Sequence, residues 1–307
     1  MEWDGHPGAL NSRMARRNAL MLTALALIWG ASFMFIKIAD RQLAPATLIL
    51  GRIGLAALTL ALTAPRGTIS ALQENARWLV VVGLVNTAIP FWLLSWGETR
   101  IQSGLASIIQ AAVPIFNAAL AFAFFRELRV TGVRLVGVAV GFVGVALLVG
   151  AQPEGKVLGA VAVVGMALCY GAGGLLASRH LREVPAHVVA LGTTVVAATV
   201  AAPAGIVQAP HDVPSWKTFA SIAVLGIVGT AIAYLLFFAI IANAGSGYAS
   251  LVTYLVPPVA LAYGAIFLGE RFGATAFVAL AIILGGVALG TGGWRVVLRR
   301  RRLASET

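Results

Sequence analysis

The 307-residue chain is 60% hydrophobic and only 11% charged, a balance that a water-soluble protein cannot reach because too few polar side chains would cover its apolar surface. Its basic excess, 22 Lys and Arg against 11 Asp and Glu, is spread through the polar breaks between apolar runs, whereas nucleic-acid binding requires a concentrated basic face. The composition therefore indicates an integral membrane protein.

Apolar runs long enough to cross a bilayer as helices recur along the whole chain, since a span needs about 20 residues. The first run follows Arg13, Arg16 and Arg17 as a secretory signal would. It is long and leads directly into further spans, so we interpret it as a retained helix. Ten spans are predicted, at about 18–39, 46–64, 77–96, 102–125, 130–150, 157–178, 187–207, 217–239, 247–268 and 273–292.

The distribution of basic residues predicts the side of the membrane that each loop faces. Cytoplasmic loops are enriched in Lys and Arg, which favours cytoplasmic positions for both termini. The run from Arg299 to Arg302 is then an anchor beside anionic lipid. We expect a multi-pass membrane protein. The basic residues on the outer side or in the helices nearest to it are Lys37, Arg41, Arg52, Arg100, Lys156, Lys217 and Arg271.

An internal repeat relates the two halves of the chain. A shift of 143 residues aligns a long stretch with itself without gaps, so that Thr87 matches Thr230 and Glu127 matches Glu270. Each repeat holds five spans, an odd number, so the second copy enters the membrane from the opposite side. The predicted fold class is an all-α integral membrane protein of ten transmembrane helices in two inverted five-helix repeats.

The predicted organisation has four parts. A cytoplasmic tail at 1–17 precedes the first repeat at 18–150, and the inverted second repeat at 157–292 precedes a basic cytoplasmic tail at 293–307. Two similar halves that exchange conformations give inward-open and outward-open states around one midplane site. The repeat therefore indicates a carrier that works by alternating access.

Several short motifs resemble a known family. They are the first-span segment from Ile28 to Phe33, the start of the fourth span from Ser103 to Ser107, and the span-end residues Glu127 and Glu270. Together with the repeat they resemble, over nearly the whole chain, the EamA family of the drug/metabolite transporter superfamily. The resemblance implies that spans 1–4 and 6–9 surround a central cavity while spans 5 and 10 pack at the periphery. It also implies a multi-pass protein of the bacterial inner membrane with cytoplasmic termini. Metabolite export is implied as well, since bacterial members include exporters of amino acids, aromatic ones among them.

Polar residues inside the spans predict where a solute binds, because such side chains must face protein or water. Spacings of three and four residues place them in one stripe on the fourth span and in a matching stripe on the ninth. Hydrogen bonding between helices is the alternative role for these residues. The first stripe is Ser103, Ser107, Gln110, Pro114 and Asn117, and the second is Ser246, Ser250, Thr253 and Pro257, with Tyr254 beside it.

Aromatic residues form a second candidate group. Trp29 and Tyr170 are equivalent in the two repeats, so they can flank a cavity and stack on an apolar or aromatic solute. An interfacial aromatic belt is the alternative for residues near span ends, such as Trp96 and Tyr248. The predicted solute-binding residues are Trp29, Ser32, Asn86, Trp92, Ser107, Gln110, Tyr170, Thr230, Tyr234, Ser250, Thr253 and Tyr254.

Prolines and glycines carry backbone predictions. Pro114 and Pro257 each remove a backbone hydrogen bond within a span, so each is a candidate hinge for a gate or, equally, a fixed bend. Glycines four residues apart in the fifth and tenth spans allow close helix packing, either within the chain or between two copies. We expect a monomer or a weak homodimer. These glycines are Gly137, Gly141, Gly286 and Gly290.

The acidic residues bear on energy coupling. A proton-coupled antiporter commonly holds a carboxylate buried in the membrane, whereas all eleven acidic residues here fall in tails, loops or span ends, Glu98 being nearest to the core. We therefore expect a facilitative uniporter that exports amino acids, with the solute and membrane lipid as its partners. A proton-coupled drug/metabolite antiporter and, less favoured, a channel are the alternatives.

No sequence pattern indicates catalysis or a cofactor. The four histidines lack the spacing of metal ligands, and no Walker A sequence is present to hold nucleotide phosphates. We therefore expect no catalytic residue, no metal, no cofactor and no nucleic-acid partner.

Overall fold

The computed structural model describes residues 7–124, 132–152, 156–244, 246–249 and 251–291, and these residues form helices joined by turns and loops, with no strand among them. Eight helical stretches in this part of the chain are long and apolar enough to cross a membrane, and two shorter apolar helices, Val252–Leu268 and Ala274–Gly290, follow them. The predicted all-helical membrane class is thus confirmed, and ten spans in inverted repeats stay a prediction. The eight stretches are Arg16–Ala39, Pro45–Leu62, Ala76–Glu98, Ser103–Phe124, Val133–Gly150, Val157–His180, Ala186–Val207 and Trp216–Ile241.

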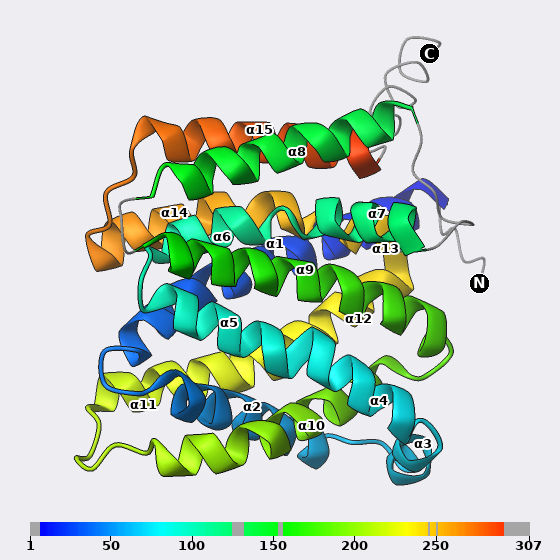
Figure 1. Cartoon of the computed structure of the whole chain (residues 1–307). Helices are drawn as coiled ribbons and strands as arrows, with labels where there is room; N and C mark the ends of the chain where they lie inside the picture. The colour runs from blue at the N-terminus through cyan, green and yellow to red at the C-terminus, as the bar shows by residue number, and fades with distance from the viewer. Residues whose placement is uncertain (1–6, 125–131, 153–155, 245, 250, 292–307) are drawn as a thin grey trace.

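The helices run back and forth across one bundle (Figure 1). In chain order they are α1 (Pro7–Ala39), α2 (Pro45–Leu62), α3 (Thr68–Glu74), α4 (Ala76–Gly83), η1 (Leu84–Ala88), α5 (Ile89–Glu98), α6 (Ser103–Gln110), α7 (Val113–Phe124), α8 (Val133–Gly150), α9 (Val157–His180), α10 (Ala186–Val207), α11 (Trp216–Ala223), η3 (Val224–Ile232), α12 (Ala233–Ala244), α13 (Ser246–Ala249), α14 (Val252–Leu268) and α15 (Ala274–Thr291).

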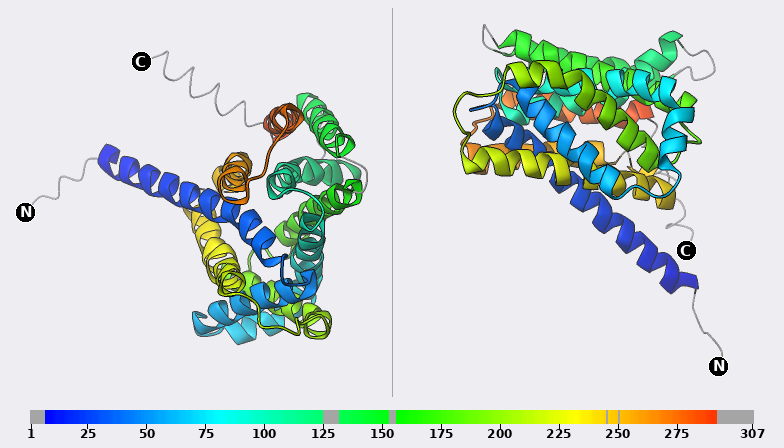
Figure 2. Two further views of the ribbon diagram at one scale, coloured as in Figure 1. Left: turned by 90° about the vertical axis from the view of Figure 1, so that its left-hand side faces the viewer. Right: turned by 90° about the horizontal axis from the view of Figure 1, so that it is seen from below.

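Local sequence explains where several helices begin and end. Helix α1 begins at Pro7 rather than at residue 18, and its N-terminal part extends away from the bundle (Figure 2). Helix α2 begins with Pro45, whose fixed φ and missing N–H suit the first helical position. Helix α14 ends at Gly269, whose φ of 67° lies in the left-handed region that glycine adopts without strain.

A π-helical stretch interrupts the third and the eighth predicted spans at corresponding places. The stretch η1 joins α4 to α5, and η3 joins α11 to α12. The shift of 143 residues carries residues 84–88 onto 227–231, which lie inside η3. A π turn widens the helix locally and is frequent at functional sites. Thr87 and Thr230 occupy these two stretches, so the halves share a backbone feature as well as a sequence pattern.

The two prolines proposed as hinges have different effects on the backbone. The fourth predicted span breaks between Gln110 and Val113, just before Pro114, where a proline cannot donate the helical hydrogen bond. Helix α14 instead runs through Pro257 without a break, and the ninth predicted span is divided earlier, between α13 and α14. The first repeat therefore has a helix end beside its proline, which the second repeat lacks.

Helices α8 and α15 lie side by side at one edge of the bundle (Figure 1). Glycines make this contact possible, because a Cβ atom on Gly137 would lie 2.3 Å from the backbone nitrogen of Gly290, and one on Gly286 would lie 2.5 Å from that of Gly141. These glycines were predicted to pack either within one chain or between two copies. In the structure they pack within one chain. Elsewhere the halves also interlock, with α1 against α14 and α2 against α10.

Candidate functional site

Arg52 brings a positive charge into the middle of α2. Its side chain is only 6% exposed, and its Nε donates a hydrogen bond to Oγ1 of Thr230 at 3.0 Å. Its guanidinium carbon lies 4.3 Å from the centroid of the Phe91 ring, a cation–π contact. Elements of both halves, namely α2 and α5 of the first and η3 of the second, thus meet at one guanidinium.

The guanidinium retains unused hydrogen-bonding capacity. Arginine is always charged and has five N–H donors, and a buried cation is costly unless it is paired. Among the described residues its one hydrogen bond is that from Nε to Thr230, and the phenols of Tyr170 and Tyr234 are near enough to interact electrostatically with the charge. The two terminal nitrogens can therefore bind a planar anion such as a carboxylate in bidentate fashion.

Four of the predicted solute-binding residues lie around or near this arginine. Thr230 is fully buried, and while accepting from Arg52 it donates to the carbonyl oxygen of Leu225 at 2.9 Å, a bond across the π turn. Ser32 is buried on α1 and lies against Gly229, where an added Cβ would be 2.9 Å from its Oγ. The structure thus brings Thr230, Tyr170, Tyr234 and Ser32 around or beside a residue that was not predicted as a ligand.

Other predicted residues occupy half-buried positions elsewhere in the bundle. The Trp29 ring on α1 lies 5.5 Å from the Phe237 ring on α12, centroid to centroid, with the planes tilted by 46°. Gln110, Thr253 and Tyr254 are also half-buried. Ser250 lies outside the described residues.

Some residues of the predicted polar stripes bond within or between helices. Ser107 is fully buried and donates to the carbonyl oxygen of Gly104 at 2.6 Å, within its own helix. Asn117 donates to the carbonyl oxygen of Gly171 at 3.3 Å and so links α7 to α9. These contacts correspond to the helix-bonding role that the sequence left open.

Two of the predicted ligands lie away from Arg52's contacts. Asn86 packs against Gly173, where an added Cβ would lie 2.5 Å from the Asn86 Cβ. Trp92 is 56% exposed on α5, near Ile89, which is 43% exposed. In a membrane protein an exposed apolar stripe of this kind contacts lipid.

A second polar cluster lies where α1 and α5 end. The Lys37 ammonium donates to two backbone carbonyl oxygens, those of Glu98 and, at 2.8 Å, Ile101. Ser95 donates to Oδ1 of Asp40 at 3.1 Å. Burial raises the pKa of the Asp40 carboxyl, just after the first span, to about 7, although the Ser95 hydrogen bond and the Lys37 charge lower it.

Glu98 is the most enclosed acidic residue of this cluster. It is the last residue of α5, yet its side chain is 0% exposed, and neither carboxylate oxygen has a hydrogen-bond partner among the described residues. The premise that no carboxylate would be buried is therefore wrong for Glu98. A position at a span end did not reveal the burial, because neighbouring helices cover the side chain.

Glu270 ties the two halves together at the same end of the molecule. Its carboxylate accepts from the backbone nitrogens of Ser103 at 2.8 Å and Gly104 at 3.2 Å, and from Oγ of Ser103 at 3.0 Å. The first free N–H groups of α6 are thus capped by a residue that follows α14, an arrangement that the helix dipole also favours.

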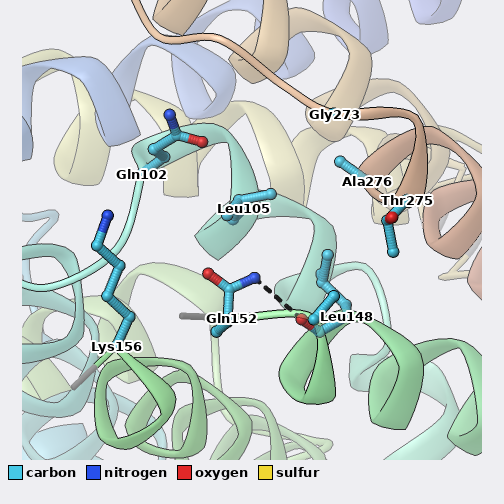
Figure 3. A pocket seen from close by; sticks show the side chains of 9 residues that line it. Gln102, Leu105, Leu148, Gln152, Lys156, Gly273, Thr275 and Ala276 are labelled. Atoms are coloured by element: carbon cyan, nitrogen blue, oxygen red, sulfur yellow. Dashed lines mark hydrogen bonds between the residues drawn. The ribbon is translucent and has the colours of Figure 1, made fainter. Parts of the chain in front are cut away.

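A separate pocket of about 280 Å³ opens near the ends of α6, α8 and α15 (Figure 3). Gln152 at its edge donates to the carbonyl oxygen of Leu148 at 2.9 Å. None of the residues predicted to bind solute lines this pocket. The lining residues are Gln102, Leu105, Leu148, Ala151, Gln152, Lys156, Gly273, Thr275 and Ala276.

Comparison with known proteins identifies similar sequences over nearly the whole chain. The EamA-like transporter family matches residues 17–150 and again 157–291. A "Probable terminal-alkyne amino-acid exporter" of Streptantibioticus cattleyicolor is 31% identical over 296 residues, covering 94% of this chain and 96% of that protein. A "Probable amino-acid metabolite efflux pump" of Salmonella typhimurium is 23% identical, covering 92% and 97%.

Two further similarities concern the membrane and the fold. An "Uncharacterized inner membrane transporter YedA" of Escherichia coli is 26% identical over 277 residues, covering 88% of this chain and 89% of that protein. A crystal structure of 19% sequence identity superposes with a TM-score of 0.64, covering 90% of this chain and 97% of that one, which shows a shared fold.

Proposed function

Because this chain belongs to the EamA-like transporter family, which matches it twice, we propose that it exports amino acids across a bacterial inner membrane by alternating access. The family and the relatives are transporters, which are not enzymes, so the chain is a multi-pass membrane transporter of a small solute. Two relatives named as amino-acid exporters support the proposed class of solute.

The observation that carries the proposal is the buried guanidinium of Arg52. Every amino acid has a carboxylate, and arginine's planar fork matches a carboxylate through two parallel hydrogen bonds. Arg52 is anchored by Thr230 and Phe91 through its Nε and its π face, which leaves the terminal nitrogens for a ligand. A bound anion would also compensate a charge that is otherwise costly to bury.

The aromatic residues support aromatic amino acids as members of the solute class. Phe91 lies at the guanidinium, Tyr170 and Tyr234 are its electrostatic neighbours, and Trp29 pairs with Phe237 between α1 and α12. Rings of this kind stack on an aromatic solute. Gln110, Thr253 and Tyr254 remain proposed lining residues of the same site.

Contact between the halves favours alternating access. The bond from Arg52 to Thr230 joins α2 of the first match to η3 of the second, so a solute bound there acts on the interface that must rearrange. The inverted orientation of the repeats, the cytoplasmic termini and a hinge at the helix break before Pro114 belong to this proposal. Facilitative transport was expected because no carboxylate was predicted to be buried. Glu98 is buried, so this argument for facilitative transport no longer holds.

The test is transport of radiolabelled amino acids in proteoliposomes. We expect saturable efflux and counterflow for the wild type, since a carrier turns over with its solute. Arg52→Lys keeps the positive charge but loses the planar guanidinium and its paired N–H donors. The amino acid concentration for half-maximal transport should therefore rise about tenfold, a loss of about 1.4 kcal/mol of binding free energy. Arg66→Lys, at an exposed loop position, is the matched control.

A second arm tests the carboxylate directly. An amino acid amide, which lacks the negative charge, should compete with the labelled amino acid far less well than the free acid does. Equal competition by the amide, or wild-type affinity in Arg52→Lys, would refute carboxylate binding at Arg52. Flux that does not saturate would indicate a channel.

A further inference from the structure

Glu98 has surroundings that no structural role explains. The hydrogen bonds of its polar neighbours go to other acceptors: Lys37 donates to two backbone carbonyl oxygens, and Ser95 donates to Asp40, while the Glu98 carboxylate is fully buried. Both carboxylate oxygens are without a hydrogen-bond partner among the described residues, and so is Oδ2 of Asp40. A structural carboxylate would be expected to accept hydrogen bonds, as Glu270 does at α6.

Enclosure of this kind is tolerable for a neutral acid and costly for an ion. Moving an ionised carboxylate out of water without donors carries a large free-energy penalty, which a bound proton removes. Ionisable side chains within membrane-spanning segments commonly belong to ion pathways or proton relays. We propose that Glu98 binds the proton that this transporter exchanges for its amino acid, an inference that rests on the proposed function.

The charged neighbours of Glu98 come from several elements. Asp40 and Lys37 lie at the end of α1, Arg52 lies on α2, and Glu270 follows α14, and each of them interacts electrostatically with Glu98. Helix α6 and the first ten residues of α9, from Val157 to Met166, carry no ionisable side chain. Glu98 thus has two other carboxyl groups near it, those of Asp40 and Glu270, against one ammonium and one guanidinium. A negative charge on Asp40 opposes a second negative charge on Glu98.

Proton exchange requires that Glu98 become accessible to water on each side of the membrane in turn. When the outer end opens, a proton from external water forms an O–H bond with the carboxylate, and the neutral acid can then be enclosed again. When the site opens to the cytoplasm, the O–H bond breaks and the proton leaves to water there. One proton then enters for each amino acid that leaves, with no oxidation or reduction.

The experiment uses proteoliposomes of the full chain with an interior one pH unit more acidic than the medium. Proton exit should drive accumulation of labelled amino acid inside, up to about tenfold for one-to-one exchange, because one pH unit corresponds to about 1.4 kcal/mol. An ionophore that collapses the gradient should abolish the accumulation. Glu98→Gln, neutral and of similar shape, should lose accumulation but retain counterflow. Glu183→Gln, in the exposed turn after α9, should behave as the wild type.

A measurement on the wild type alone guards against misfolding of the variant. Adding amino acid outside vesicles at equal pH should raise the internal pH, read with a trapped dye, because protons leave as solute enters. Counterflow without a dye response or gradient-driven accumulation would overturn the proton site and leave the exporter intact. No amino acid flux at all would overturn the proposed function itself. Accumulation by Glu98→Gln, or its loss of counterflow, would overturn the role given to Glu98.

Discussion

Two buried charged side chains define the chemistry at the scale of single residues. Arg52 has a hydrogen bond from Nε and an aromatic ring, so its charge is partly stabilised while its terminal nitrogens stay available. The Glu98 carboxylate is unexposed and has no hydrogen-bond partner among the described residues, so a proton is the simplest means of stabilising it. The two residues therefore suit a permanent anion-binding role and a reversible proton-binding role, respectively.

Asp40 gives a pH prediction at this scale. Its carboxyl, with a pKa of about 7, is largely neutral below that pH and ionised above it, and when ionised it opposes a second negative charge on Glu98. In Asp40→Asn that opposition is absent, so the pH for half-maximal proton-driven transport should move down by about one unit. The asparagine oxygen can still accept from Ser95, which preserves the local hydrogen bond.

Rates measured between pH 5 and 9 for Asp40→Asn and the wild type provide the check. The two curves should converge below about pH 6, where Asp40 is neutral in the wild type. An unchanged profile, or a shift to higher pH, contradicts the electrostatic role assigned to Asp40. Asp212→Asn, on the exposed loop before α11, is the control.

Arg52 and Glu98 also show what single-residue patterns leave undetermined. Arg52 entered the sequence analysis only through the charge balance, although an arginine inside an apolar run is itself a signal of a functional site. The sequence correctly placed Glu98 at a span end, but its enclosure depends on neighbouring helices such as α1 and α9, which pack against α5. Such contacts join residues that are far apart in sequence, and no local period encodes them.

At the scale of elements, hydrophobic length predicted the helices well because a spanning helix must satisfy its own backbone hydrogen bonds. Interruptions were harder to predict. The helix break before Pro114 agrees with the missing N–H of proline, whereas α14 continues through Pro257. The length of an apolar run does not predict the two π-helical stretches. Packing against neighbouring helices decides whether a span tolerates such a feature.

The α8–α15 contact gives a prediction for helix packing. A Cβ on Gly286 would lie 2.5 Å from the Gly141 nitrogen and 2.7 Å from the Gly137 oxygen, both backbone atoms that cannot rotate away. Gly286→Ala should therefore lower the melting temperature in detergent by about 2–5 °C, corresponding to about 1–3 kcal/mol of overpacking. Gly285→Ala is a matched control, since nothing lies within 4 Å of its Cβ position. Equal melting temperatures for the two variants would contradict this packing.

At the scale of the whole molecule, the halves are joined in the middle by Arg52 and Thr230 and, where α5 and α14 end, by Glu270. We propose that this second end faces the outside of the cell. The Glu270 carboxylate accepts hydrogen bonds from three donors at the start of α6, so its removal should weaken the contact between the halves at this end without changing the proposed solute site. Loss of a helix cap costs about 0.5–2 kcal/mol. An equilibrium between closed and open outer ends should therefore shift by roughly tenfold in Glu270→Ala.

Cysteine accessibility measures that shift in whole cells. Cys169 is the single native cysteine, so Cys169→Ala with Ile101→Cys places one reporter at a residue that is 2% exposed beside the Lys37 contact. A membrane-impermeant maleimide should label it from outside slowly in this background and about tenfold faster when Glu270→Ala is added. Equal labelling rates would mean that the Glu270 cap does not hold the outer end closed. Labelling only after the membrane is opened would place this end in the cytoplasm and reverse the predicted topology.

An alternating-access carrier further predicts that an amino acid gradient alters the labelling rate, because the solute shifts the population of the two states.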